Sequence, residues 1–80
     1  MNTVIFTGWK EGLKKISLTN LLREKAGLSL TQAKLNVDAI VDGVTIEVKC
    51  STISKMESLV REATELGAIC KVSKKNLVRA

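Results

Sequence analysis

Residues 15–38 have the sequence KISLTNLLREKAGLSLTQAKLNVD, which predicts two consecutive helices and the turn between them. The first helix is expected at 14–26. At 3.6 residues per turn, one arc of this helix is apolar and consists of Leu18, Leu21 and Leu22. Gly27 follows directly and is suited to end the helix, because glycine readily adopts the left-handed conformation of a C-cap.

The second helix begins at once after this turn. Ser29 and Gln32 have the S-x-x-Q spacing of a capping box, in which each side chain bonds the backbone of the other residue. One apolar face follows at helical spacing and consists of Leu30, Ala33, Val37 and Ile40. Two helices joined by a short turn are therefore expected here.

Strands and a third helix flank this pair. Residues 3–7 are rich in β-branched residues, and 44–49 alternate between apolar and polar, so both are predicted strands with Val44 among the inward residues. A third helix, capped by Ser51 or Thr52 and ended by Gly67, is expected next. Its buried stripe is predicted to be Ile53, Met56, Leu59, Val60 and Ala63. Residues 68–72 form the predicted last strand.

The resulting order, β-α-α-β-α-β, predicts an α+β fold of two layers. If the first strand lies between the other two, the sheet is three-stranded and antiparallel, and three helices cover one of its faces. With 80 residues, the chain is expected to form one domain over 1–72. Residues 73–80 are expected to form a flexible basic tail.

Composition narrows the functional classes. The net charge of +5 favours acidic partners without choosing among protein, nucleic acid and membrane surfaces. The chain has no histidine, and its two cysteines have no metal-binding spacing, so we expect no enzyme, metal or cofactor. No signal peptide or membrane span is recognisable, which predicts a cytoplasmic protein with reduced thiols.

One side of the first helix carries an apolar residue that the core does not use. Ile16 lies roughly 160° from Leu18 on the helical wheel, and the residues expected around it are Lys15, Thr19, Asn20, Arg23 and, from the second helix, Lys34. Two interpretations remain. This surface is either a solvated helix face with one exposed isoleucine, or a docking patch for an acidic helix with an apolar stripe.

The segment 15–38 resembles the signature of the C-terminal domain of the bacterial ribosomal stalk protein. The G-L-x-L-x-x-A-K core of that signature is present as Gly27, Leu28, Leu30, Ala33 and Lys34, and Val37 follows in register. Near the end of the third helix, E-L-G-A is similar to the family's E-A-G-A. The resemblance spans about 3–72.

This resemblance implies a role in docking translational GTPases. Residues at matching positions would carry the contact: Lys15, Ile16, Arg23, Leu28 and Lys34. The three cations would meet acidic side chains, Ile16 would fill an apolar notch, and Leu28 would pack at the edge.

The sequence departs from the family pattern at several places. Thr19 and Asn20 replace an apolar residue and a lysine, Thr31 and Gln32 replace a lysine-glutamate pair, and Leu35 and Asn36 replace an acidic and an apolar residue. The family's N-terminal dimerisation domain and hinge are also missing from this sequence. We therefore expect a stand-alone domain that does not join the stalk in the usual way.

Two alternative functions remain open. A Clp-protease adaptor resembles the same fold, but its peptide site uses acidic and histidine groups where residues 8–12 read GWKEG. A nucleic-acid-binding protein would use a phosphate-contacting strip consisting of Lys74, Lys75 and Arg79 together with Lys49 and Lys71.

Two further side chains have predicted positions. Trp9 is expected in a loop at 8–12, where it packs as a lid on the core. Cys70 is in phase with the inward residues of the last strand and is expected to be buried, whereas Cys50, at a strand end, is expected to be partly exposed.

Overall fold

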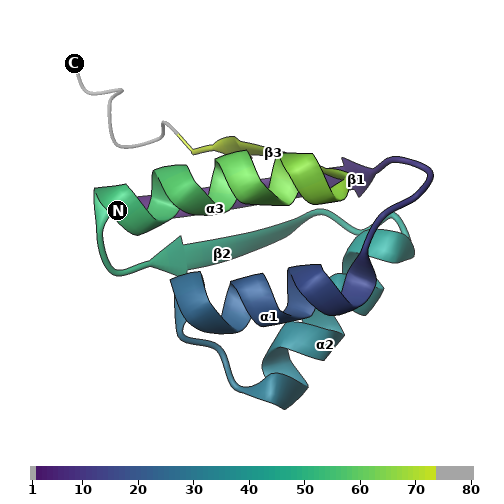
Figure 1. Ribbon diagram of the computed structural model, residues 1–80, viewed down its shortest axis with the longest axis horizontal. Coiled ribbons are helices and arrows are strands. Elements are labelled where there is room, and N and C mark those ends of the chain that lie inside the picture. Colours follow the sequence, from purple (N-terminus) through teal and green to yellow (C-terminus); the bar gives the residue numbers. More distant parts are fainter. Residues whose placement is uncertain (1, 74–80) are drawn as a thin grey trace.

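The computed structural model describes residues 2–73, and its six elements follow the predicted order (Figure 1). These elements are β1 (Asn2–Trp9), α1 (Lys15–Ala26), α2 (Leu30–Val41), β2 (Ile46–Cys50), α3 (Ile53–Leu66) and β3 (Ala68–Val72). The expected tail residues Lys74, Lys75 and Arg79 lie outside the described residues. The α+β fold class is confirmed.

The three strands form one sheet of order β2-β1-β3, in which β1 pairs antiparallel with both neighbours. Val4 lies between Val48 and Val72 in this register. The helices cover one face of the sheet (Figure 1). Val4 and Phe6 are buried on that face. Lys49 and Lys71 pair with the alternate residues of β1 and are exposed on the other face. The sequence alternation on β1 and β2 thus corresponds to a two-layer structure with one uncovered sheet face.

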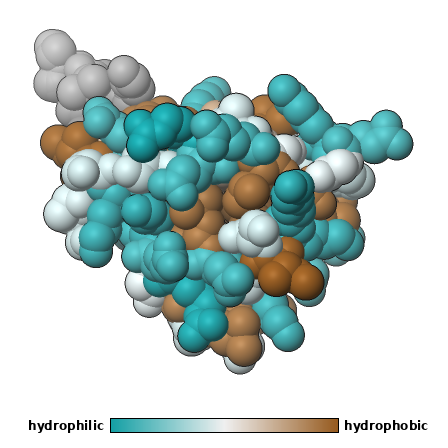
Figure 2. Space-filling view, in the orientation of Figure 1, coloured by the Kyte–Doolittle hydropathy of each residue, from teal (hydrophilic) through white to brown (hydrophobic). Residues whose placement is uncertain are grey.

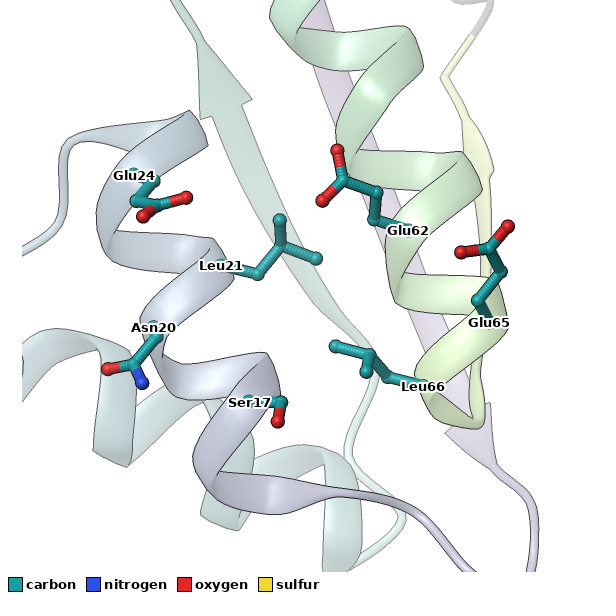
Figure 3. Close-up of a pocket in the computed structure, with 7 residues that line it drawn as sticks. All are labelled: Ser17, Asn20, Leu21, Glu24, Glu62, Glu65 and Leu66. Atoms are coloured by element: carbon teal, nitrogen blue, oxygen red, sulfur yellow. The ribbon is translucent and has the colours of Figure 1, made fainter.

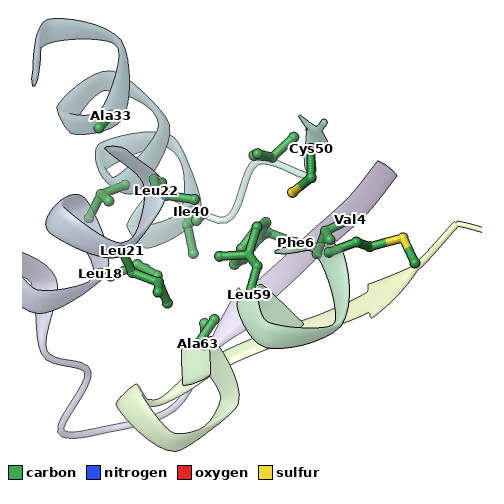
Figure 4. Packing of buried hydrophobic residues seen from close by; sticks show 14 residues of the cluster. Val4, Phe6, Leu18, Leu21, Leu22, Ala33, Ile40, Cys50, Leu59 and Ala63 are labelled. Atoms are coloured by element: carbon green, nitrogen blue, oxygen red, sulfur yellow. The ribbon is translucent and has the colours of Figure 1, made fainter. Parts of the chain in front are cut away.

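The core lies between the sheet and the helices (Figure 4). Every element contributes to it, and the largest fully buried side chains are Phe6, Leu18, Leu22, Ile40, Leu59 and Val4. Phe6 is on the central strand, so its ring contacts the layer of helices from the middle of the sheet. Burying an aliphatic or aromatic side chain of this kind contributes about 1.5–3 kcal/mol.

The predicted helix ends are confirmed. Gly27 ends α1 with φ of 69°, and Gly67 ends α3 with φ of 107°. Ser29 and Gln32 form the expected capping box, with the Gln32 N–H donating to Ser29 Oγ at 3.1 Å. Thr52 is the cap of α3, since its Oγ1 accepts the Lys55 N–H at 3.1 Å. Local hydrogen bonds and glycine conformations therefore determine where these helices begin and end.

The first strand is longer than predicted and contains a β-bulge. Gly8 and Trp9, expected in a loop, pair with Ile69 and Ala68, and the register shifts by one residue between Phe6 and Gly8. Because a bulge moves all following side chains to the opposite face, Trp9 lies on the helix side, as the buried Ala68 does. Its Nε1–H donates to the Val41 carbonyl at 3.0 Å, and 41% of its surface is exposed. Trp9 thus joins β1 to the end of α2 instead of covering the core completely.

Leu30, the first residue of α2, was predicted on the apolar face of its helix but is 45% exposed. Two further apolar residues predicted to be buried are also exposed. Val44 is 52% exposed because the turn after α2 continues through it: its N–H donates to the Ala39 carbonyl at 2.9 Å, and β2 begins only at Ile46. Ile53 is 60% exposed as the first residue of α3, one turn before the buried Met56. In both cases the sequence prediction began the buried face of the element too early.

The two thiols are free and lie on the helix side of the sheet. Cys50 is buried, so the expectation of partial exposure was wrong; its strand-end position is covered from the core side. Cys70 is half-buried, with Sγ 3.8 Å from Thr64 Oγ1. The two cysteines pair with Asn2 and Phe6 on opposite sides of β1. The two cysteines are therefore separated by two strand spacings of about 4.8 Å each. This separation exceeds the Cα–Cα distance of about 7 Å that a disulfide can span.

We expect both thiols to be protected in the native protein. Desolvation by burial raises the pKa of Cys50 above its ordinary value of 9.0, an effect that Lys55 partly offsets. Desolvation also raises the pKa of Cys70, and the Thr64 hydrogen bond partly offsets it. Reaction with a disulfide reagent at neutral pH should be at least about 100-fold slower than in urea, because the thiolate is the reactive form.

The same shifts give a pH dependence with a definite sign. The unfolded chain loses its thiol protons first, so the free energy of unfolding should fall as pH rises through 9.0 and above. Urea titrations of the wild type and a Cys50→Ala/Cys70→Ala variant measure this slope. An equal slope in both proteins would contradict the assignment of the pH dependence to the thiols.

Candidate docking site

The exposed isoleucine predicted on α1 lies where the sequence places it. Ile16 is 81% exposed, in the first turn of α1, and points away from the core that Leu18 and Leu22 enter. Lys15 precedes it as the first residue of the helix and is exposed as well. The apolar side chain is thus presented to solvent beside a cation.

A shallow hollow between α1 and α2 brings this residue to the second helix. Its volume is about 310 Å³, and its lining consists of Lys15, Ile16 and Thr19 from α1 with Lys34, Val37 and Asp38 from α2. Three of the five predicted contact residues, Lys15, Ile16 and Lys34, therefore line one depression. Its base is Val37, which belongs to the core.

Thr19 does not lie on the exposed side as expected. Its exposed fraction is 8%, and its Oγ1–H donates to the Lys15 carbonyl at 2.9 Å. This bond within the helix satisfies the hydroxyl, so the side chain is buried without an unpaired polar group. Thr19 therefore lines the hollow between α1 and α2 as a nearly buried residue.

The other two predicted residues line a second hollow further along α1. Arg23 and Leu28 lie there together with Asn20, Glu24 and Gly27. Arg23 follows Thr19 by one helical turn, so the two hollows are neighbours on the same helix. We call the surface formed by Lys15, Ile16, Arg23, Leu28 and Lys34 the docking patch.

Two features of this surface were not predicted. Asp38 lines the first hollow with Lys34, and their i, i+4 spacing on α2 was the available signal. Leu35 is 64% exposed and therefore off the core face, but it does not line either hollow. The docking patch is therefore an apolar centre with three cations at its border, and two carboxylates, Asp38 and Glu24, line the same two hollows.

The arrangement is suited to binding an acidic surface. A hollow with one apolar projection and flexible cations can accept an acidic surface, with the charges steering the encounter. Within residues 2–73, no cluster of three or more potential metal ligands is present. No helix in the same range has the length and apolarity to cross a membrane.

The structure also shows where the described residues of the two alternative functions lie. Lys49 pairs with Thr3 and Lys71 with Ile5, so both cations flank β1 on the uncovered sheet face. The bulge turns Trp9 to the opposite face, and the described part of this sheet face has no aromatic residue for stacking on bases. Near residues 8–12, the backbone N–H of Lys10 donates to the Gly67 carbonyl at 2.7 Å, so it is not free for a peptide.

No known protein-family model matches this sequence, and no curated protein matches it significantly.

Proposed function

We propose that this chain is a non-enzymatic protein-binding module that docks an acidic, apolar-striped helix of a partner onto the docking patch. The position of Ile16 carries the proposal: it projects into solvent at a hollow that two helices border with Lys15 and Lys34. Covering a side chain that is 81% exposed would remove apolar surface from water, which favours association with a partner. The cations around it favour a partner with carboxylates at matching positions.

The resemblance to the stalk domain suggests the class of partner. We propose a translational GTPase, reached in the cytoplasm, with Lys15, Arg23 and Lys34 meeting acidic side chains. Ile16 would enter an apolar notch of the partner, and Leu28, half-buried in the turn between α1 and α2, would pack at its edge. The contact needs no change in the domain itself, since the two helices already hold these residues on one surface.

Charge reversal in the patch tests this proposal. A Lys15→Glu/Lys34→Glu variant should bind a purified elongation-factor GTPase roughly 30-fold more weakly, because like charges would then meet across the contact. Isothermal titration at two salt concentrations measures the dissociation constants. Ile16→Ala should weaken binding by roughly tenfold, mainly through faster dissociation.

A matched control separates the patch from net charge. Lys49→Glu/Lys71→Glu makes the same change of charge on the uncovered sheet face, where both residues are exposed. Its affinity should remain within about threefold of the wild type, apart from a small loss of long-range steering. Equal weakening by the two double variants, or unchanged affinity of the patch variant, would refute docking through α1 and α2.

A further inference from the structure

A third hollow is bordered by carboxylates, in contrast to the lysines of the docking patch. It lies between α1 and α3, has a volume of about 300 Å³, and we call it the α1–α3 groove. Figure 2 shows hydrophobic surface in this region, bordered by hydrophilic side chains. Leu21 and Leu66 point into it from opposite sides (Figure 3).

Carboxylates border this groove. They come from both helices and are Glu24, Glu62 and Glu65, and Ser17 and Asn20 complete the lining. Asn20 and Glu24 also line the second hollow of the docking patch. Only Glu62 has an ion-pair partner among the described salt bridges, Lys25, and the Nζ–Oε2 distance is 3.9 Å. Because both members of this pair are partly exposed, it contributes little and can exchange for another cation at small cost.

The groove and the docking patch are therefore complementary in charge. Ile16 projects beside Lys15 and Lys34 in the patch, whereas Leu21 and Leu66 lie among glutamates in the groove. On the helical wheel of α1, Ile16 and Leu21 lie roughly 140° apart, so one copy cannot bring its Ile16 into its own groove. Two copies can.

We propose that the chain associates with itself head to tail, with Ile16 of one copy in the α1–α3 groove of the next. Such an interface joins two different surfaces, so each added copy leaves one patch and one groove free. The contact is small, which predicts a weak dissociation constant of about 10 µM to 1 mM. Self-association would cover Ile16 and Lys34 and would therefore compete with any partner of the docking patch.

This inference needs no partner protein, so it can fail independently of the proposed function. Sedimentation of the purified chain should show a mean mass that rises with concentration up to about 1 mM and falls when salt is raised, since salt screens exposed ion pairs. A wild type that stays monomeric at about 1 mM in low salt would overturn the proposal.

Exchange of the charges gives the sharper test. A Lys15→Glu/Lys34→Glu variant and a Glu62→Lys/Glu65→Lys variant should each be monomeric, because like charges then face each other within each homogeneous sample. An equimolar mixture should associate again, because each reversed surface finds its complement on the other variant. Loss of association in both variants without recovery on mixing would overturn the proposal.

Net charge cannot produce this recovery. From +5, the first variant has 5 − 4 = +1 and the second has 5 + 4 = +9, so both proteins remain positive and repel each other overall. The mixture also controls for misfolding, since an unfolded variant would not restore a defined oligomer. Ile16→Ser should weaken wild-type association several-fold without a change of charge, and an unchanged mean mass would exclude the isoleucine from the contact.

Discussion

Replacing Gly67 with alanine should lower the free energy of unfolding by about 3 kcal/mol or more, a large part of the stability of so small a domain. Gly67 has φ of 107°, where an L-residue is strained. A Cβ atom there would lie 3.0 Å from Cα and 3.4 Å from the nitrogen of Leu13, and both are backbone atoms that cannot rotate away. Urea unfolding, followed by the fluorescence of the single tryptophan, measures the loss.

The neighbouring hydrogen bonds prevent a simple adjustment. The Lys10 N–H donates to the Gly67 carbonyl at 2.7 Å, and the Lys14 N–H donates to the Leu66 carbonyl at 3.0 Å. These bonds fix the loop before α1 against the end of α3, so moving Leu13 away would break them at about 1 kcal/mol each. Strain and steric overlap therefore add at this glycine.

Gly27→Ala is the matched control. Gly27 also ends a helix with positive φ, 69°, but no atom lies within 4 Å of the position that a Cβ would occupy. Its replacement should cost only about 1 kcal/mol, the cost of the left-handed conformation. Equal losses at the two glycines would show that the contact with Leu13 has no energetic role.

The sequence predicted those features of the fold that local chemistry determines. Gly27 and Gly67 end helices, and the Ser29–Gln32 box begins one. Each acts on backbone within a few residues, so these helix ends can be predicted without knowledge of the fold. The order of elements and the central position of β1 then follow, because three strands and three amphipathic helices have few ways to bury their apolar sides.

The errors arose where tertiary contacts decide. The bulge that turns Trp9 toward α2 depends on the pairing of β1 with β3, and no local pattern distinguishes it from a loop at Gly8. Thr19 is polar and was therefore expected to be exposed, yet its hydroxyl donates a hydrogen bond to the Lys15 carbonyl within the helix. A polar residue whose hydrogen bond is satisfied locally can be buried, so its polarity alone does not predict exposure.

The candidate site was predictable in part for the same reason. Helical phase alone predicts that Ile16 is exposed. The lysines near it in the sequence are then expected on the same surface. The α1–α3 groove was not predicted, because Glu24 and Glu62 are far apart in the sequence and meet only when α1 packs beside α3. Helical periodicity shows which face of a helix is free, but it does not show which other helix borders that face.

Replacing Phe6 with alanine should be as damaging as any single truncation in the core, with an expected loss of about 3–5 kcal/mol. Phe6 is fully buried, is the only phenylalanine, and lies on the central strand between Ile46 and Cys70. The ring of Phe6 lies between the sheet and the helices. Truncation would leave a cavity there that neither layer can fill without moving the other. The expected result is a domain close to its unfolding midpoint at room temperature.

Ile5→Ala on the same strand gives the control for Phe6→Ala. Ile5 is adjacent, but it points to the uncovered sheet face and is only half-buried, so its truncation should cost about 1 kcal/mol through reduced strand preference and packing. If Phe6→Ala proves too unstable to purify, Phe6→Leu should retain the fold with a loss of about 1–2 kcal/mol, because most of the volume is kept. Urea midpoints of the three variants test the order, and a larger loss for Ile5→Ala than for Phe6→Leu would mean that the core lies on the other face of the sheet.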